Sequence, residues 1–478
     1  MNDTQPLRPS PAFKRFAALD ALRGFAILTM VLSGAIPYQI LPAWMYHCQV
    51  PPPDHKFNPQ LPGITWVDLV FPFFLFCLGA AIPFALQRRL ERGLTNLQAV
   101  GIILKRGALL FAFAIYQPHF APYNLKTDPE WLSNVYGIIG FVLLFPMMMR
   151  LPDNLPKVWH WIIRGVGWGC AAILLSRFQY KNEPLTFSLY RSNIILMLLT
   201  VSAVFGSLAW LFTRDNLLLR LGLLGFLFAH RLACENPGWV KTLTDFVSIP
   251  KIWHLTYAHY LFIVLPGTIA GDFMLRWLAV RDTDTTSGWK KSQYGLLVAL
   301  GIILTVGNLI GLKARWVEAT VIFDFVMVFV SLVLTRSPQN HTESFLRELA
   351  CWGGYWLLLG MAFEPYEGGI KKDPNTMSYF FVTTGLALFL IISFTIALDL
   401  WHVKRGTSLL VANGQNPMIA YVGMGLLIEP ILSLTGLGPV LERLLPGAWL
   451  GTLRGFLLTL LLAWIVALFT RMKVFWRT

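Results

Sequence analysis

The strongest constraint in this sequence is the recurrence of apolar runs close to twenty residues long. An α-helix needs such a run to cross the hydrocarbon core of a bilayer, which is about 30 Å thick. Hydrophobic residues make up 55% of the 478-residue chain and charged residues only 13%, against roughly 25% charged residues in soluble domains. The sequence therefore predicts an all-α, polytopic membrane protein with about 12 to 14 transmembrane helices.

Fourteen stretches are apolar enough to be expected as helices. Two of them are weaker: 216–233 is short and contains Arg220 and His230, and 158–176 contains Arg164. The number of spans falls to twelve if these two do not cross. We find no repeat and no soluble domain longer than a loop, and we expect one integral-membrane domain over 1–478. The expected helices cover 18–40, 64–86, 104–122, 132–149, 158–176, 193–213, 216–233, 255–279, 294–312, 317–335, 348–364, 377–400, 415–436 and 451–470.

Basic residues predict which side of the membrane each loop faces, because short cytoplasmic loops are rich in lysine and arginine. Such residues cluster near 88–92, 105–106, 276–291, 404–405 and 471–477. These clusters share one side if the expected helices alternate. Both termini are then cytoplasmic, with 1–17 as a cytoplasmic tail, while 41–63 and 365–377 become outer loops.

The basic balance of the chain does not indicate a nucleic-acid partner. The net charge is +14, but the basic residues are spread over short loops and form no basic domain or stripe. The five cysteines show no CxxC and no paired spacing. His254 and His259 are five residues apart and do not share a helix face well. The sequence therefore predicts no disulfide framework and no metal.

The first outer loop combines two histidines with an acid at the start of the next helix. His47 and His55 lie on either side of three consecutive prolines, and Asp68 follows. Imidazole titrates near neutral pH and can take a proton from a hydroxyl or an amine, while a carboxylate orients it. The alternative is structural, because Thr65 and Asp68 have capping-box spacing and loop histidines are often only solvated.

Cations gather at the opposite, inner edge. Asp20 and Arg23 are three residues apart on one helix face, and Arg89 and Arg106 are expected on the same side. Guanidinium groups bind phosphate through forked hydrogen bonds, which suits a phosphorylated cytosolic ligand. A local ion pair with positive-inside anchoring is the structural alternative.

Two acids fall inside expected helices. Asp324 lies in VIFDFVMVF and Glu429 in LLIEPIL. An ionisable group at membrane depth is costly and usually faces a cavity or a partner. Asp324 is expected to lie deeper and to face a substrate cavity, whereas Glu429 is expected near the outer end, where water reaches it.

Three sequence blocks resemble one family. ALDALRGFAILTMVL, followed by His47 and PGITWVDLVFPFFLFCLGAAIPFAL, is similar to the heparan-alpha-glucosaminide N-acetyltransferase family and its bacterial relatives. GGIKKDPNTMSYFFVTTGLALF and the weaker NGQNPMIAYVG follow in the expected order. The resemblance implies a transmembrane acyltransferase that takes acetyl groups from cytosolic acetyl-CoA and delivers them to a sugar across the membrane. It also implies a bacterial source, and hence the cytoplasmic (inner) membrane.

The resemblance also assigns roles to residues. The family histidine matches His47 by its aromatic context and His55 by its distance from Asp68, so both remain candidates. The late block implies that Lys371 and Lys372 shape the acceptor or donor channel, and the third block adds Asn416. The chain departs from the family at Gly34, where a helper asparagine is expected.

We therefore expect an acyltransferase in which acetyl-CoA binds near Arg23, Arg89, Arg106 and Asn416. The histidine acts as a general base or carries the acetyl group covalently. A proton-coupled transporter or flippase for a glycan or cell-wall fragment is the alternative, and a structural subunit is a third hypothesis. The expected partners are acetyl-CoA, a sugar or glycan acceptor and the lipid bilayer, with a homodimer left open. Residue types do not decide between O- and N-acylation.

Overall fold

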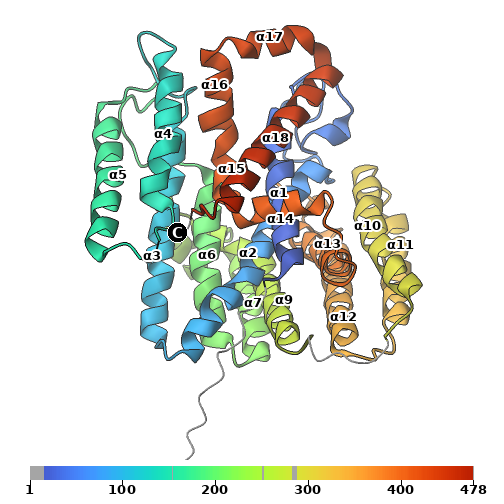
Figure 1. The fold of residues 1–478 in the computed structure, drawn as a ribbon. Helices are drawn as coiled ribbons and strands as arrows, with labels where there is room; N and C mark the ends of the chain where they lie inside the picture. Colours follow the sequence, from blue (N-terminus) through green and yellow to red (C-terminus); the bar gives the residue numbers. More distant parts are fainter. Residues whose placement is uncertain (1–14, 153, 250–251, 282–287, 477–478) are drawn as a thin grey trace, which may run out of the picture.

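The computed structural model describes residues 15–152, 154–249, 252–281 and 288–476, which fold into helices without a β-strand (Figure 1). Eleven helical spans in these residues are long and apolar enough to cross a membrane, and α4 is a shorter apolar helix. These spans confirm the predicted all-α, polytopic architecture. The cytoplasmic placement of both termini stays a prediction, and residues 1–14 of the expected tail lie outside the described residues.

The helices are α1 Ala17–Ala35, α2 Trp66–Glu91, α3 Asn96–Phe120, α4 Leu132–Met148, α5 Lys157–Arg177, α6 Ile194–Thr213, α7 Leu217–Ala233, α8 Trp239–Val247, α9 Leu261–Val280, α10 Lys291–Lys313, α11 Val317–Leu334, α12 His341–Ala362, α13 Met377–Thr395, α14 Thr407–Gln415, α15 Pro417–Gly423, α16 Glu429–Leu434, α17 Leu437–Leu444 and α18 Gly447–Arg471. Short 3₁₀-helices are η1 Ala43–Met45, η2 Leu255–Tyr260 and η4 Tyr366–Gly368, and π-helical turns are η5 Ile396–Leu400 and η6 Met424–Ile428.

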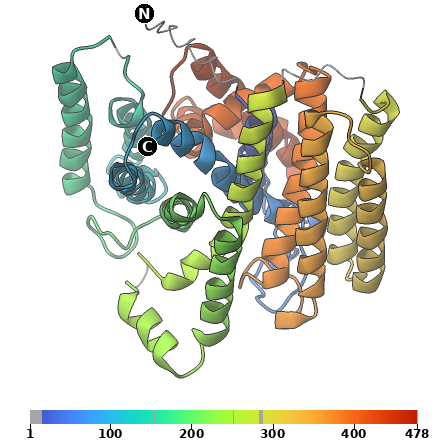
Figure 2. The ribbon, with the colours of Figure 1, turned by 90° about the horizontal axis from the view of Figure 1, so that it is seen from below.

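The centre of the bundle consists of the spans that are most buried. The α2 span, the η2–α9 span and the α13–η5 span are 72%, 78% and 78% buried, whereas α5 is only 11% buried. In Figures 1 and 2, α4 and α5 lie at one edge of the molecule and the α10–α11 hairpin at the opposite edge. The most central helices therefore include α2, which carries Asp68, and α13, which follows the loop that carries Lys371 and Lys372.

The expected helix boundaries fail where proline acts. α1 ends at Ala35 rather than near residue 40, because Ile36 precedes Pro37 and adopts an extended conformation. Similarly, Asn416 precedes Pro417 and separates α14 from α15. The expected helix 415–436 is therefore preceded by the separate helix α14, which the apolar pattern did not predict.

α14 packs against α1 at glycines. A Cβ atom added to Gly24 would lie 1.8 Å from the Leu410 carbonyl oxygen, and one added to Gly414 would lie 1.8 Å from that of Asp20. Only residues without a side chain allow two helix backbones to approach this closely. The two glycines therefore set the distance between α1 and α14.

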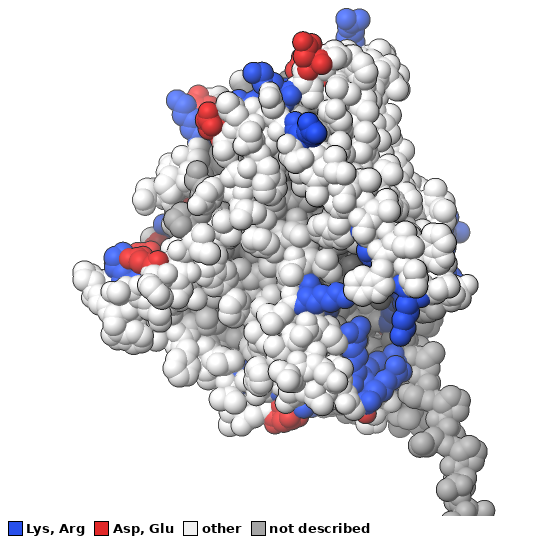
Figure 3. Space-filling model, turned by 90° about the vertical axis from the view of Figure 1, so that its left-hand side faces the viewer, with Lys and Arg blue, Asp and Glu red and all other residues white. Residues whose placement is uncertain are grey.

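Charged side chains are unevenly distributed on the face of the molecule drawn in Figure 3. A broad area without charges lies between a mixed group at the top and lysine and arginine side chains gathered at the lower right, and a pair of opposite charges lies at mid-height on the left edge. A largely uncharged surface is expected of a protein that spans a bilayer.

Candidate active site

His47 and Asp68 are in direct contact. His47 lies in the loop after α1, and Asp68 lies in the first turn of α2. His47 Nδ1 is 2.8 Å from Asp68 Oδ1. A carboxylate oxygen accepts, so Nδ1 carries the proton and Nε2 keeps its lone pair. The His47 side chain is 35% exposed, which leaves the ring accessible, whereas Asp68 is fully buried.

The second oxygen of Asp68 caps the N-terminus of α2. Oδ2 accepts from the backbone N–H groups of Thr65, at 2.9 Å, and Cys48, at 3.1 Å. Asp68 thus forms the capping box that the spacing predicted and contacts the histidine as well. The two interpretations of Asp68 from the sequence are both compatible with this geometry, because each uses a different oxygen.

Lys372 comes from the loop between α12 and α13 to the same histidine. Its Nζ lies 3.1 Å from His47 Nδ1 and 3.3 Å from Nε2. Because Nδ1 donates to Asp68, the nitrogen that can accept from Lys372 is Nε2. Burial lowers the pKa of Lys372 below its ordinary value, although the carboxylates of Asp68 and Asp373 act in the opposite direction.

An ion pair and a hydrogen bond hold this loop from the α7 side. Arg231 bonds through two nitrogens to Glu367 Oε1, at 3.0 and 2.5 Å, and to the Asn375 carbonyl at 2.5 Å. Glu367 Oε2 in turn accepts from the Met377 N–H at 2.7 Å. These contacts fix the segment that presents Lys372. Sequence reasoning missed Arg231, since no local spacing links α7 to residues so much later in the chain.

The other outer candidates have different surroundings. His55 Nε2 lies 3.2 Å from the Gln39 carbonyl oxygen, and its ring packs against Tyr38 and Tyr46. Lys371 is only 6% exposed, and its backbone N–H donates to Thr376. The structure thus brings His47, Asp68 and Lys372 together.

The predicted donor-side residues divide into two groups. Arg89 and Arg106 are exposed at the end of α2 and in the first half of α3. Arg23 is largely buried and bonds to Asp20, to the Gly414 carbonyl and to the Cys77 carbonyl. Asn416 is buried and bonds to Thr470 and to the backbone near the C-terminus. Arg23 and Asn416 therefore link helices to one another.

The two acids inside helices lie on α11 and α16. Asp324 is fully buried in the α10–α11 hairpin, where Oδ1 accepts from Asn308 Nδ2 at 2.7 Å. Its Oδ2 has no hydrogen-bond partner among the described residues. Glu429 begins α16.

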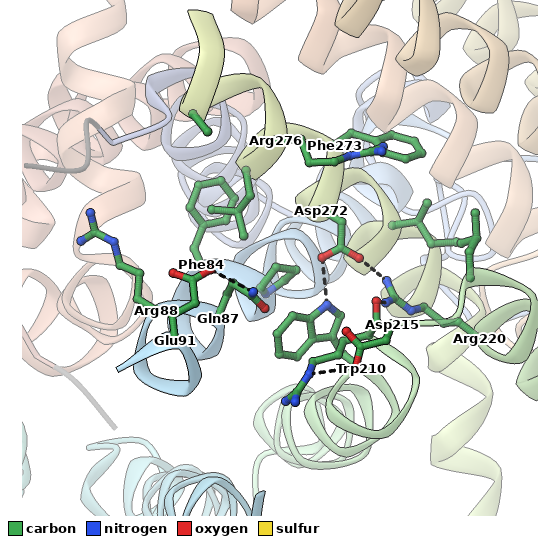
Figure 4. A pocket seen from close by; sticks show the side chains of 16 residues that line it. Phe84, Gln87, Arg88, Glu91, Trp210, Asp215, Arg220, Asp272, Phe273 and Arg276 are labelled. Carbon is green, nitrogen blue, oxygen red and sulfur yellow. Dashed lines mark hydrogen bonds and ion pairs between the residues drawn. The ribbon is translucent and has the colours of Figure 1, made fainter. Parts of the chain in front are cut away.

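A pocket of about 600 Å³ opens between α2, α6, α7 and α9 (Figure 4). At its wall, buried Arg220 bonds to Asp272 at 2.5 Å, and Trp210 Nε1 donates to the same carboxylate at 3.0 Å. Further charged residues line it, namely Arg88, Glu91, Arg214, Asp215 and Arg276. Pro83 in its wall lies fifteen residues after Asp68, about 22 Å along the axis of α2. The pocket and the His47 group therefore lie at opposite ends of one helix.

One more group of side chains has the chemistry of metal ligands. His230, Cys234 and His259 place possible metal-ligating atoms within 4.8 Å of one another. The sequence paired His259 with His254 and missed this arrangement, because His230 and His259 lie on separate helical segments. That the protein needs no metal stays a prediction.

Comparison with curated proteins finds distant relatives. The chain is 28% identical over 160 residues to heparan-alpha-glucosaminide N-acetyltransferase of Mus musculus. The matched segment covers 32% of this chain and 22% of the relative. The Homo sapiens protein of the same name is 27% identical over 153 residues, covering 31% and 21%. The matches thus span about a fifth of the length of these relatives. They support a distant relationship to these acetyltransferases.

A family model matches a longer part of the chain, from residue 15 to residue 274. This range contains the His47–Asp68 pair and most residues that line the pocket in Figure 4. The lining residues Leu275, Arg276 and Ala279 lie beyond residue 274. Because the match covers more than half of the 478 residues, the chain belongs to the family described as "Domain of unknown function (DUF5009)".

Proposed function

We propose that this protein is a transmembrane acyltransferase that moves an acetyl group from acetyl-CoA to a sugar or glycan on the other side of the membrane. The observation that carries this proposal is the group formed by His47, Asp68 and Lys372. It provides an accessible imidazole with its tautomer set by a buried carboxylate and a neighbouring amine. The distant likeness to N-acetyltransferases supports the same reaction class.

His47 is the proposed general base. Nε2 takes the proton from an acceptor hydroxyl or amine as that group attacks the thioester carbonyl, while Asp68 retains the proton of Nδ1 by hydrogen bonding. For this step Lys372 must leave Nε2, to which it donates in the structure, and it donates instead to the oxygen that becomes negative in the tetrahedral intermediate. Collapse of the intermediate breaks the C–S bond, and CoA leaves as the thiol after taking up the proton. In the covalent route Nε2 itself attacks the thioester carbonyl and the C–S bond breaks; the acceptor then attacks the acetyl-imidazole, the C–N bond breaks, and the freed Nε2 takes the acceptor's proton and passes it to the CoA thiolate.

The donor is proposed to enter from the end of the bundle that carries Arg89 and Arg106. The pocket between α2, α6, α7 and α9 offers space for a large part of the donor, and Arg88, Arg214 and Arg276 add cations near its phosphates. The distance of about 22 Å from this pocket to Asp68 along α2 suits a long, flexible pantetheine arm. We propose that Arg23 and Asn416 support the donor side by holding α1, α14 and the C-terminal segment.

On the acceptor side, Lys372 touches His47 and Lys371 is the neighbouring cation. We propose that both contribute to acceptor binding at the predicted outer end. His55 is proposed to shape the loop through its contacts with Gln39, Tyr38 and Tyr46.

The alternative function, a proton-coupled transporter, is favoured by one observation. Asp324 is fully buried and one of its oxygens has no partner among the described residues. A carboxyl group of this kind is typical of proton-coupled pathways. In that case transport depends on a proton gradient and Asp324→Asn abolishes it, whereas acetyl-CoA does not bind.

The test compares acetyl-CoA binding with acetyl transfer in detergent-purified protein. His47→Ala is expected to abolish transfer to sugar acceptors while calorimetry still detects acetyl-CoA binding. His55→Ala is the comparison, since it removes a histidine from the same loop, and a much smaller loss of transfer is expected because its proposed role is to shape the loop. Full transfer by His47→Ala, or no binding of acetyl-CoA to the wild type at millimolar ligand, contradicts the proposal.

A further inference from the structure

The end of α7 brings together two imidazoles and a thiol outside the His47 group. His230 and Cys234 are four residues apart, so one helical turn places them on the same face. His259 approaches from η2, and the three ligating atoms lie within 4.8 Å of one another. We propose that these three residues bind a divalent metal ion of the zinc type.

The orientation of His230 favours this role. Thr244 donates its hydroxyl hydrogen to the Val240 carbonyl at 2.8 Å, so its oxygen is left to accept from His230 Nε2–H at 3.0 Å. His230 Nδ1 then presents its lone pair toward His259 Nε2, 2.9 Å away. Metal-ligating histidines are held in this way, with the second ring nitrogen hydrogen-bonded to a neighbouring group.

The donor set also fits the ion. Zinc binds imidazole nitrogen at about 2.0–2.1 Å and thiolate sulfur at about 2.3 Å. Cys234 and His259 are 7% and 3% exposed, so water is largely excluded from them. Three protein ligands leave one position of a tetrahedral ion open for water or an added ligand. This set distinguishes zinc-type ions from magnesium and calcium, which prefer oxygen ligands.

A different account of the same residues needs no metal. Arg231 can only donate, so His259 Nδ1 accepts from it at 3.3 Å, and His259 Nε2–H donates to His230 Nδ1. In the proposed site the ion takes the place of that hydrogen, and the His259 proton moves to Nδ1. The thiol of Cys234 releases its proton to solvent. Arg231 gives up its contact with His259 and keeps those with Glu367 and Asn375.

Metal binding at this place ties α7 to η2. The residue between the ligands on α7, Arg231, holds the loop that presents Lys372 to His47. The ion is therefore inferred to steady that loop rather than to contact the reacting groups. Its binding is independent of whether the proposed acetyl transfer is correct.

The test uses Co²⁺ as a spectroscopic substitute for zinc. The full chain, purified in detergent and treated with a chelator, is titrated with Co²⁺. We expect one equivalent to bind, with visible bands of a four-coordinate ion and a thiolate-to-cobalt charge-transfer band. Added Zn²⁺ is expected to bleach both. If the wild type develops no such bands, the three residues form only the hydrogen bonds described above, and the proposal of a metal site is wrong.

Two variants identify the ligands. Cys234→Ser is expected to lose the charge-transfer band, and Cys170→Ser, which alters an exposed cysteine, is expected to keep it. A band that persists in Cys234→Ser places the cobalt elsewhere and overturns the assignment. Circular dichroism and elution volume show whether each variant is folded. The wild-type titration needs no variant, and none of these readouts uses acetyl-CoA.

Discussion

Asp68→Asn tests the central contact most sharply, because the two side chains have nearly the same shape. Asp68 accepts His47 Nδ1–H with one oxygen and the N–H groups of Thr65 and Cys48 with the other. Asparagine has one acceptor oxygen and one NH₂ group, which can only donate. One side of the residue must therefore lose its partner or change.

The geometry decides which side changes. If the NH₂ group faces Thr65 and Cys48, two N–H groups lose their acceptor in the protein interior, at a cost of about 1–3 kcal/mol each. If it faces His47, the ring can switch to the tautomer with hydrogen on Nε2, which costs one contact, that of Nε2 with Lys372, rather than two. We expect the second arrangement. The variant then stays folded, but Nε2 cannot act as a base.

A histidine in the wrong tautomer strongly lowers the rate of the catalysed reaction. The same substitution in a serine-protease triad lowers kcat by roughly 10⁴-fold, which corresponds to about 5 kcal/mol of activation free energy. We expect a loss of between roughly 10³ and 10⁴ in acetyl transfer, with the free energy of unfolding reduced by no more than about 3 kcal/mol.

Acetyl transfer and thermal unfolding are measured on the same preparation. Asp54→Asn is the control, because it removes an exposed acid from the same loop and leaves the buried contacts intact. Transfer by Asp68→Asn at more than a tenth of the wild-type rate refutes the reasoning about the tautomer. A variant that fails to fold refutes the reasoning about the helix cap.

Three further substitutions probe the surroundings. Burial lowers the pKa of Lys372, so the wild type gains stability as the pH rises from that lowered pKa to the ordinary lysine pKa of about 10.4. In Lys372→Met, unfolding temperatures measured at pH 7 and pH 10 should no longer show this gain. Acetyl transfer by the same variant should be reduced. Arg231→Lys loses the forked contact with Glu367, and we expect at least a tenfold lower kcat/KM with circular dichroism unchanged. Gly24→Ala places a Cβ 1.8 Å from the Leu410 carbonyl and should cost about 3 kcal/mol of unfolding free energy, whereas Gly101→Ala, which meets nothing within 4 Å, should be tolerated.

The apolar pattern was sufficient to predict the helical bundle, because lipid solvation imposes a strong and local signal on each span. The failures have local causes. α14 contains Asn413, Gly414 and Gln415, and its polarity hides a helix that packs by close backbone approach to α1. Arg220 interrupts an apolar run in the sequence, but in the fold it reaches Asp272 on another helix.

The candidate site was predictable only in part. The spacing of Thr65 and Asp68 predicted the helix cap, since a cap depends on residues within one turn. Lys372 was identified by resemblance, but its contact with His47 joins residues 325 positions apart. No periodicity carries that information. The choice between His47 and His55 also depends on tertiary packing, because the loop folds His55 against Tyr46.

One oxygen of Asp68 caps the first turn of α2 and the other orients His47, so the orientation of His47 depends on whether that turn is folded. Helix ends open far more readily than whole domains unfold. When that turn frays, the carboxylate loses its anchor and the proposed base loses its orientation in the same event. Activity is then lost at the temperature at which this single turn melts, which is lower than the temperature at which the helical bundle unfolds.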